Sequence, residues 1–369
     1  MKHPLHRPVL GDEELTAVSE VLKSGHLVQG PRVAAFEERL SEILGIRHVV
    51  AVSSGTAALH VSAVALGLTP HDEVIVPAFG FPATANAVEL TGARAVPADV
   101  DLERFALTVE SIEAVASERT VGVILVHSFG IPAPTPELQA LCESRGWWLV
   151  EDAACALGTI QEGRWGSGEL PVCLSFHPRK TVTTGEGGVV ATQDDALARR
   201  LRTLRNHGMD PDAQGWSRFS RAGFNYRMSD LSAAIGVVQL GRLEDIVSER
   251  RRVAALYGEA LASTPGVRLP KGYELPDLSC QSVVVELERS IDRDAVISGL
   301  SELGIQTTIG GYALADQPYF IERYGIRSED FPGAGRLAKS CLTLPVTVEM
   351  NREDVEHVTA SLRTVMENR

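Results

Sequence analysis

Lys180 is the residue in this sequence with the clearest opportunity for covalent chemistry. It lies in SFHPRKTVTTGEGGVV (175–190), five residues before a glycine-rich turn and between two apolar, strand-like runs. A lysine amine can form a Schiff base with a carbonyl compound. The adjacent Arg179 cannot supply a free amine because its guanidinium stays protonated, so we expect it on the surface.

Asp152 is the carboxylate that we expect to act with this lysine. It follows the apolar run in WWLVEDAA (147–154), where burial is costly for a carboxylate unless a cationic partner meets it. Glu151 is left out because side chains alternate along a strand, so it points to the opposite face. Taken alone, Asp152 is more typical of a helix cap.

A phosphate-binding turn is expected in SSGTAAL (53–59). Ser54, Gly55 and Thr56 lie there between a strand-like run and a helix-like run. Unpaired amide groups and the helix dipole favour a phosphate at such a place. For a turn of this kind in isolation, an ordinary helix N-cap is the commoner interpretation.

Short apolar strands alternate with helical patterns through the first two thirds of the chain. The strand-like runs are HVVAVSS (48–54), DEVIVPAFGF (72–81), RAVPADV (94–100), VGVILVHSFG (121–130), WWLVEDAA (147–154), VCLSFHP (172–178) and GGVVATQD (187–194). This alternation predicts an α/β fold with a mostly parallel sheet sandwiched by helices. In such a sheet, ligands bind beyond the carboxyl ends of the strands.

A smaller unit is expected toward the C-terminus. The chain has 369 residues, and one compact core usually holds roughly 250–300. A helical pattern from Ser229 through Leu256 would carry the chain out of the first unit, so we place the boundary near residue 245. We therefore predict a large domain over 1–245 and a smaller C-terminal α+β domain over 246–369.

The composition disfavours several other classes of protein. The formal net charge of −13 is spread without a basic block, so no nucleic-acid partner is expected. No apolar run approaches the ~18 residues of a membrane helix, and the first residues do not resemble a secretory signal. We expect a soluble, cytoplasmic protein.

A metal site and a disulfide framework are also not expected. The five cysteines are scattered without CxxC spacing, so they are read as reduced thiols. His60 and His127 lie in apolar segments and form no ligand cluster, which favours hydrogen-bonded roles in the core.

Lys180, Asp152 and the turn at Ser54–Thr56 would meet at one edge of the predicted sheet. They are the parts that pyridoxal 5′-phosphate needs: an amine for the Schiff base, a carboxylate that keeps the ring nitrogen protonated, and an anchor for the phosphate. We therefore predict a site for this cofactor.

The chain resembles the DegT-type aminotransferases, a group within the aspartate-aminotransferase-like (type I fold) pyridoxal enzymes. The resemblance runs from about residue 8 to the C-terminus. It rests on SGTAALH, DEVIVPAFGFPATANAV, EDAACALG, SFHPRKTVTTGEGG and GFNYRMSDLSAAIGVVQL, in this order.

The resemblance implies a role for individual residues. Lys180 would form the Schiff base, and Asp152 would partner the pyridine nitrogen. The other implied cofactor contacts are Gly55, Thr56 and Ser175 at the phosphate, Phe81 stacked on the ring, and Asn225 at the phosphate of the neighbouring subunit. The last contact implies a homodimer with shared active sites.

The family also implies a reaction. Its members typically transfer an amino group, here from glutamate or glutamine, to the keto carbon of a nucleotide-linked deoxysugar. Two alternatives stay open: a pyridoxamine-phosphate-dependent sugar dehydratase, in whose relatives histidine replaces the lysine, and a non-catalytic sensor or binding protein of the same fold. The presence of Lys180 and Asp152 argues against both.

Three departures from the family pattern concern the cofactor ring, at Cys155, and the substrate side, at the other two places. Cys155 follows EDAA where a glutamine or histidine near the ring hydroxyl is usual. Gly310, Gly311 and Tyr312 replace the usual His-Tyr-Pro, and Ile131 stands where glutamine is common. An aminotransferase acting on a non-nucleotide keto substrate is therefore kept as an alternative.

Overall fold

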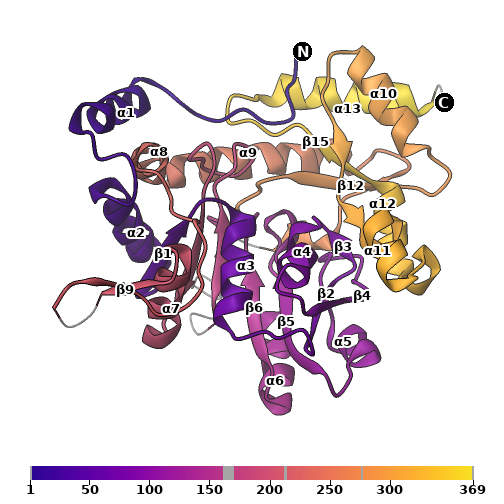
Figure 1. Ribbon diagram of the computed structural model, residues 1–369. Coiled ribbons are helices and arrows are strands. Elements are labelled where there is room, and N and C mark those ends of the chain that lie inside the picture. Colours follow the sequence, from indigo (N-terminus) through magenta and orange to yellow (C-terminus); the bar gives the residue numbers. More distant parts are fainter. Residues whose placement is uncertain (1, 161–169, 212–213, 276, 368–369) are drawn as a thin grey trace.

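A seven-stranded mixed sheet forms the centre of the larger part of the molecule (Figure 1). The structure is a computed structural model that describes residues 2–160, 170–211, 214–275 and 277–367. The order in the sheet is β1-β8-β7-β6-β5-β2-β4. The strands are β1 (His48–Val52), β2 (Glu73–Pro77), β4 (Arg94–Ala98), β5 (Thr120–Val126), β6 (Trp148–Asp152), β7 (Val172–Ser175) and β8 (Gly188–Thr192). Among these described strands, β8 runs in one direction and the other six run in the opposite direction. The sheet is therefore mostly parallel, as predicted.

Helices cover both faces of this sheet, as the apolar strands predicted. Along β1, Val49 and Ala51 pack into a core with α2 and α8, whereas Val50 and Val52 pack into a core on the other face with α3 and α7. The helices of this part are α1 (Asp12–Ser24), α2 (Pro31–Leu44), α3 (Gly55–Ala65), α4 (Ala83–Glu89), α5 (Val109–Val115), α6 (Thr135–Arg145), α7 (Asp195–Arg205), α8 (Asp230–Gly241) and α9 (Leu243–Leu261).

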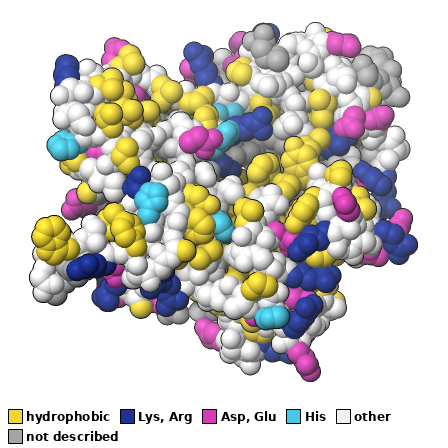
Figure 2. All heavy atoms as spheres, viewed as in Figure 1, with side chains coloured by type: hydrophobic (Ala, Val, Ile, Leu, Met, Phe, Trp, Pro, Cys, Tyr) yellow, Lys and Arg dark blue, Asp and Glu magenta, His cyan; other side chains and the backbone are white. Residues whose placement is uncertain are grey.

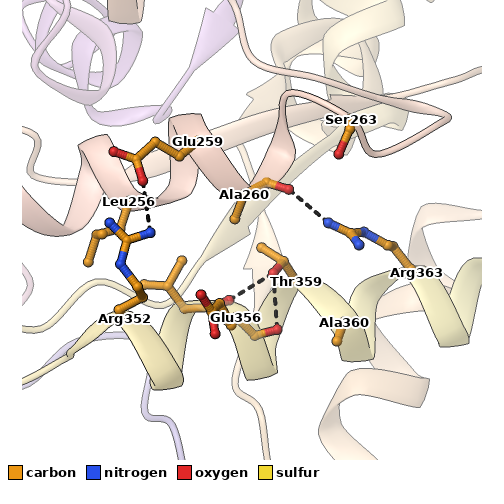
Figure 3. A pocket seen from close by; sticks show the side chains of 10 residues that line it. Leu256, Glu259, Ala260, Ser263, Arg352, Glu356, Thr359, Ala360 and Arg363 are labelled. Atoms are coloured by element: carbon orange, nitrogen blue, oxygen red, sulfur yellow. Dashed lines mark hydrogen bonds and ion pairs between the residues drawn. The ribbon is translucent and has the colours of Figure 1, made fainter.

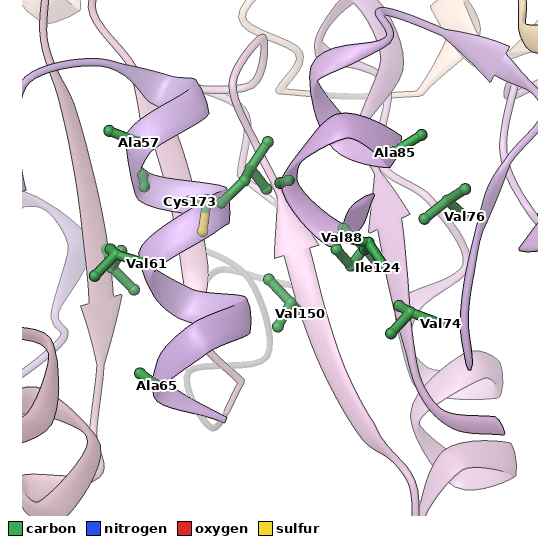
Figure 4. Close-up of a cluster of buried hydrophobic side chains, with 14 of the residues drawn as sticks. Ala57, Val61, Ala65, Val74, Val76, Ala85, Val88, Ile124, Val150 and Cys173 are labelled. Carbon is green, nitrogen blue, oxygen red and sulfur yellow. The ribbon is translucent and has the colours of Figure 1, made fainter. Parts of the chain in front are cut away.

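The core on the α3 face is built from small and branched side chains (Figure 4). Ala57, Val61 and Ala65 lie along α3 and belong to the same core as Val150 of β6 and Cys173 of β7. Alanine on the helix lets α3 lie close to the sheet. This close packing fixes the first turn of α3 relative to the strand ends.

A second, smaller layer lies at the upper right of Figure 1. Its antiparallel sheet has the order β11-β12-β15-β13. The elements are β11 (Val267–Arg268), β12 (Val283–Leu287), β13 (Thr308–Ile309), β15 (Cys341–Leu344), α10 (Arg293–Glu302), α11 (Pro318–Tyr324), α12 (Pro332–Ser340) and α13 (Arg352–Glu367), with 3-10 turns at 271–274, 314–316 and 328–330 and another at 128–130 in the large part.

The helical run predicted from Ser229 through Leu256 is wrong in one respect. Ser229 does begin it, since its hydroxyl accepts from the amide of Ser232 as the N-cap of α8. The run breaks at Arg242, whose backbone (φ −105°, ψ 4°) ends α8 before α9 begins. The Arg242 guanidinium bonds Glu13 and Glu14 at the start of α1, and this contact accompanies the break.

The domain boundary near residue 245 stays a prediction. Helix α9 contributes to both cores: Ile246 and Val247 pack beneath the large sheet, whereas Val253 and Tyr257 pack in the small layer. The residues around 245 are therefore part of a continuous helix between two cores.

Two short ladders lie outside the main sheets. β3 (Phe79–Gly80) pairs with β14 (Tyr312–Ala313) and joins the large part to the small layer. β9 (Met209–Pro211) pairs with β10 (Ser217–Phe219) in a hairpin at the lower left of Figure 1. None of the helices in the described ranges is both long enough and apolar enough to cross a membrane.

Gly122→Ala should destabilise the protein by about 1–3 kcal/mol. Gly122 on β5 pairs with Trp148 on β6, and a Cβ at position 122 would overlap the indole ring. The matched control is Gly258→Ala in α9, where a Cβ meets no atom within 4 Å and alanine favours the helix. Urea unfolding of both variants checks this, and equal midpoints for the two would contradict it.

Candidate active site

The carboxyl ends of β1, β6 and β7 bring the predicted site residues to one edge of the large sheet. β7 is parallel to β6, and β1 runs in the same direction because both β1 and β7 are antiparallel to β8. Asp152 ends β6 and Ser175 ends β7, with Lys180 five residues further on. The phosphate turn at Ser54 follows β1.

The turn after β1 forms a tight cradle. The Ser54 hydroxyl caps α3 by accepting from the amide of Ala57 at 3.1 Å. A Cβ at Gly55 would lie 2.7 Å from the Cβ of Ser175, and a Cβ at Gly188 would overlap the carbonyl of Ser54. Thr56 is exposed. The first amides of α3 have no partner inside the helix and can donate to an anion here.

Asp152 is buried and hydrogen-bonded at both carboxylate oxygens. The hydroxyl of Thr84 donates to Oδ2 at 2.7 Å, and the amide of Ala154 donates to Oδ1 at 3.1 Å. Burial raises the pKa of the carboxyl above its ordinary value, although these two hydrogen bonds and the nearby Lys180 favour the charged form. The sequence predicted a cationic partner, whereas the protein itself supplies a hydroxyl and an amide.

Thr84 was not identified from the sequence. It lies in α4, in the apolar run PATANAV, and nothing in its local pattern marks it as a partner of a residue 68 positions away.

Lys180 is half-buried, and its amine donates to the sulfur of Cys155 at 3.1 Å. Its backbone amide closes a turn onto the carbonyl of His177 at 2.8 Å. Arg179 is exposed, as predicted. Cys155, which stands where the family usually has a glutamine or histidine near the ring hydroxyl, is thus in contact with the lysine.

The aromatic residue expected to stack on the cofactor ring is open to solvent. Phe81 is 70% exposed, and its ring lies 6.2 Å from that of Tyr312 in an edge-to-face arrangement. Gly311 brings the small layer close to β3, because a Cβ there would lie 2.9 Å from the Phe79 ring. Ile131 is fully buried in an apolar core with Phe79 rather than exposed at an open surface.

Asn225 is exposed on a strand-like segment beside the phosphate turn. The segment forms an isolated antiparallel bridge between Asn225 and Asn206, and the carbonyl of Tyr226 accepts from the amide of Ser53 at 2.9 Å. The contact of Asn225 with a second subunit stays a prediction.

The two core histidines have hydrogen-bond partners, as predicted. His60 bonds the hydroxyl of Tyr226 at 2.9 Å. His127 bonds Glu151 at 2.8 Å, which confirms that Glu151 faces away from Asp152, and accepts from the amide of Ala133. No cluster of residues that could hold a metal is found in the described part of the chain.

The face shown in Figure 2 is hollowed near its centre, above the upper end of α3 in the same view. Histidine and charged side chains line one side of the hollow and apolar side chains the other. The hollow lies at the carboxyl edge of the sheet, where ligands of such folds bind.

A surface pocket between α9 and α13 lies elsewhere (Figure 3). Its volume is about 430 Å³, and it contains none of the predicted site residues. Its arginines are already engaged, Arg352 with Glu259 and Arg363 with the carbonyl of Ala260. A second pocket of about 600 Å³ beside α10 and α12 also lacks the predicted residues.

Comparisons with known proteins show the family and the fold. A model of the DegT/DnrJ/EryC1/StrS aminotransferase family matches residues 8–363. The aminotransferase TlmJ from Streptoalloteichus hindustanus is 34% identical, covers 99% of both chains and has a TM-score of 0.90. DesV from S. venezuelae is 33% identical over 96% of this chain and 94% of its own, with a TM-score of 0.89. DesI, whose structure was determined in the presence of its TDP-sugar product, is 33% identical over 100% of this chain and 94% of its own, with a TM-score of 0.89.

The fold and the site define an aminotransferase with the type I fold. The chain belongs to the DegT/DnrJ/EryC1/StrS aminotransferase family, since the family model spans nearly all of it. The predicted family, fold class and enzyme class are confirmed, and a non-catalytic role is set aside.

Asp152→Asn should change how the stability of the cofactor-free protein depends on pH. Because burial raises the pKa of Asp152 in the folded state, its ionisation opposes folding, and the wild type should lose stability relative to the variant as pH rises above the ordinary value of 3.8. The difference levels off above the folded-state pKa.

Urea unfolding of both proteins at pH values between about 4 and 8 measures this difference. A hydrogen bond lost in the variant changes the stability difference between the two proteins by the same amount at every pH. Only the change of this difference with pH therefore reports the ionisation of the carboxyl. A difference that does not vary with pH would contradict the prediction.

Proposed function

We propose that this protein is a pyridoxal 5′-phosphate-dependent aminotransferase. It transfers an amino group from glutamate or glutamine to a keto group of a nucleotide-linked deoxysugar. The observation that carries the proposal is the convergence of the Lys180 amine, the buried Asp152 carboxylate and the glycine cradle at Gly55 on one sheet edge. Each of the three matches one part of the cofactor.

The cradle at the start of α3 fits the phosphate. The amides of Gly55 and Thr56 and the hydroxyl of Ser175 would hold it, and the dipole of α3 would favour its charge. The glycine supports this role because Ser175 leaves no room for a side chain at position 55.

Asp152 fits the ring nitrogen. A buried carboxylate with a raised pKa is stabilised when a protonated nitrogen becomes its partner. Thr84 and Ala154 hold the carboxylate in place. When bound, the cofactor supplies a ring that withdraws electrons from the carbon bearing the amino group. Phe81, which is exposed in this structure, would cover one face of this ring.

Lys180 acts as the base and acid of the reaction. Its amine would take the proton from the substrate carbon and give it back when the amino group has been transferred. Lysine at this position also argues against the dehydratase alternative. The reaction runs as two half-reactions at one site, first with the amino donor and then with the ketone.

The substrate class is supported by the related DesI, whose structure was determined in the presence of its TDP-sugar product. One feature favours the alternative of a non-nucleotide keto substrate. Ile131 replaces a glutamine that is common in the family and is buried among apolar side chains, so it offers no polar group to an acceptor.

A homodimer with shared active sites completes the proposal. Large apolar side chains are exposed on α1, where Leu15 and Leu22 are 69% and 59% exposed on one face of the helix, and on the β9–β10 hairpin, where Trp216 and Phe219 are 71% and 66% exposed. Figure 2 shows apolar side chains gathered over both regions. Exposed apolar surface of this kind is typical of an interface.

Reduction with borohydride should trap pyridoxal 5′-phosphate on Lys180. Lys180→Ala should keep its fold and lose transamination, because it removes the amine that we propose moves the proton. Peptide mapping locates the label, and circular dichroism checks the fold. A label on another lysine would contradict the assignment.

The same preparation identifies the acceptor. Glutamate and glutamine are assayed as donors against nucleotide-linked 3-keto and 4-keto sugars and against the corresponding free keto sugars. Turnover of the free sugars alone would favour the non-nucleotide alternative without affecting the assignment of Lys180.

Mixing Lys180→Ala and Asn225→Ala subunits should restore part of the activity. If Asn225 serves the neighbouring subunit, a mixed dimer contains one site in which both residues are intact. Activity is measured after subunit exchange and compared with the sum of the two parents. No gain over that sum, or an active monomer by light scattering, would refute the shared site.

A further inference from the structure

Lys180 contacts Cys155, a residue to which the proposed function assigns no role. The amine donates to Sγ at 3.1 Å, and the thiol is the hydrogen-bond partner that the described part of the structure gives this amine. The sulfur therefore holds the amine in one position.

The turn that carries Cys155 is fixed from two sides. The carbonyl of Cys155 accepts from the hydroxyl of Ser279 at 3.4 Å. The hydroxyl of Thr159 donates to the carbonyl of Gly130 at 2.7 Å and accepts from the amide of Ser279 at 2.9 Å. Ser279 is fully buried and Thr159 nearly so. The position of the thiol is thus set by the fold and not by Lys180 alone.

Cys155 also differs from the other cysteines in its exposure. Cys142, Cys173, Cys280 and Cys341 are buried, whereas Cys155 is half-buried. A cysteine that only fills space in a core is normally buried and inert. The partial exposure of Cys155 beside the amine fits a group that serves the site.

We propose that Cys155 is a positioning residue for Lys180. Its sulfur accepts the hydrogen bond of the amine whenever that amine is not bonded to the cofactor, and it keeps the amine next to the end of β6. The role of Lys180 in this inference rests on the proposed function, whereas the contact itself does not. Holding the amine reduces the freedom of a long side chain that must return to one place in each cycle.

The contact can be tested without any turnover. Ortho-phthalaldehyde condenses with one amine and one adjacent thiol to a fluorescent isoindole, with loss of two waters and no change in oxidation state. The cofactor-free wild type should form this product between Lys180 and Cys155, as located by peptide mapping. Lys180→Met and Cys155→Ala should not form it at these positions.

The outcomes separate the contact from the function. Absence of the product in wild type, while a small thiol reagent still labels Cys155, overturns the inference. Cofactor bound to Lys180 should suppress the product. If the cofactor binds and the product still forms, the contact stands and the proposed role of Lys180 in cofactor binding fails.

The positioning role is tested by the rate of cofactor uptake. Loss of one hydrogen bond should slow the uptake of pyridoxal 5′-phosphate by cofactor-free Cys155→Ala about three- to tenfold. Cys155→Ser should retain most of the rate because its hydroxyl also accepts a hydrogen bond. Uptake by Cys155→Ala at the wild-type rate overturns the role, and circular dichroism controls for misfolding of either variant.

Discussion

The shared direction of β1, β6 and β7 is the constraint on which the candidate site depends. These strands come from separate parts of the chain, yet all of them end at one edge of the sheet. β8 runs the opposite way between β1 and β7, so it begins at the same edge and packs Gly188 against the carbonyl of Ser54. The cradle at Gly55, the Asp152 carboxylate and the Lys180 amine therefore lie at one edge, although more than 120 residues separate Gly55 from Lys180 in the sequence. The close packing of α3 on the sheet keeps the cradle rigid.

Local dipoles, rather than the overall charge, make this edge suited to an anion. The chain has a formal net charge of −13, so a phosphate gains nothing from the protein's total charge. The first amides of α3 supply the favourable field over a short distance. Asp152 places a negative group at the same edge. Its carboxylate is buried and accepts hydrogen bonds from a hydroxyl and an amide, and no cation among the described residues is bonded to it. A site with these two features is complementary to a ligand that carries a negative end and a protonated ring.

The sequence predicted those helices and strands that follow from a local pattern of apolar residues. It did not predict features that depend on contacts between distant parts of the chain. Short apolar runs that alternate with helical patterns identified β1 and its neighbours as buried strands, and the parallel order that this alternation predicts identified the edge. The break at Arg242 could not be predicted, because the guanidinium bonds Glu13 and Glu14 at the far end of the chain. Thr84 was missed for the same reason, since only the fold brings its hydroxyl to Asp152.

The small layer also determines the site, although most of the predicted residues lie in the large part. The β3–β14 ladder and the close approach of Gly311 to Phe79 tie the segment before Phe81 to the small layer. Ser279, which precedes β12, holds the turn of Cys155. A movement of the small layer would therefore shift both Phe81 and the thiol, while Asp152 and the cradle at Gly55 stay with the sheet. The sheet thus positions Asp152 and the cradle at Gly55, and the small layer helps to position Phe81 and the Cys155 thiol that contacts Lys180.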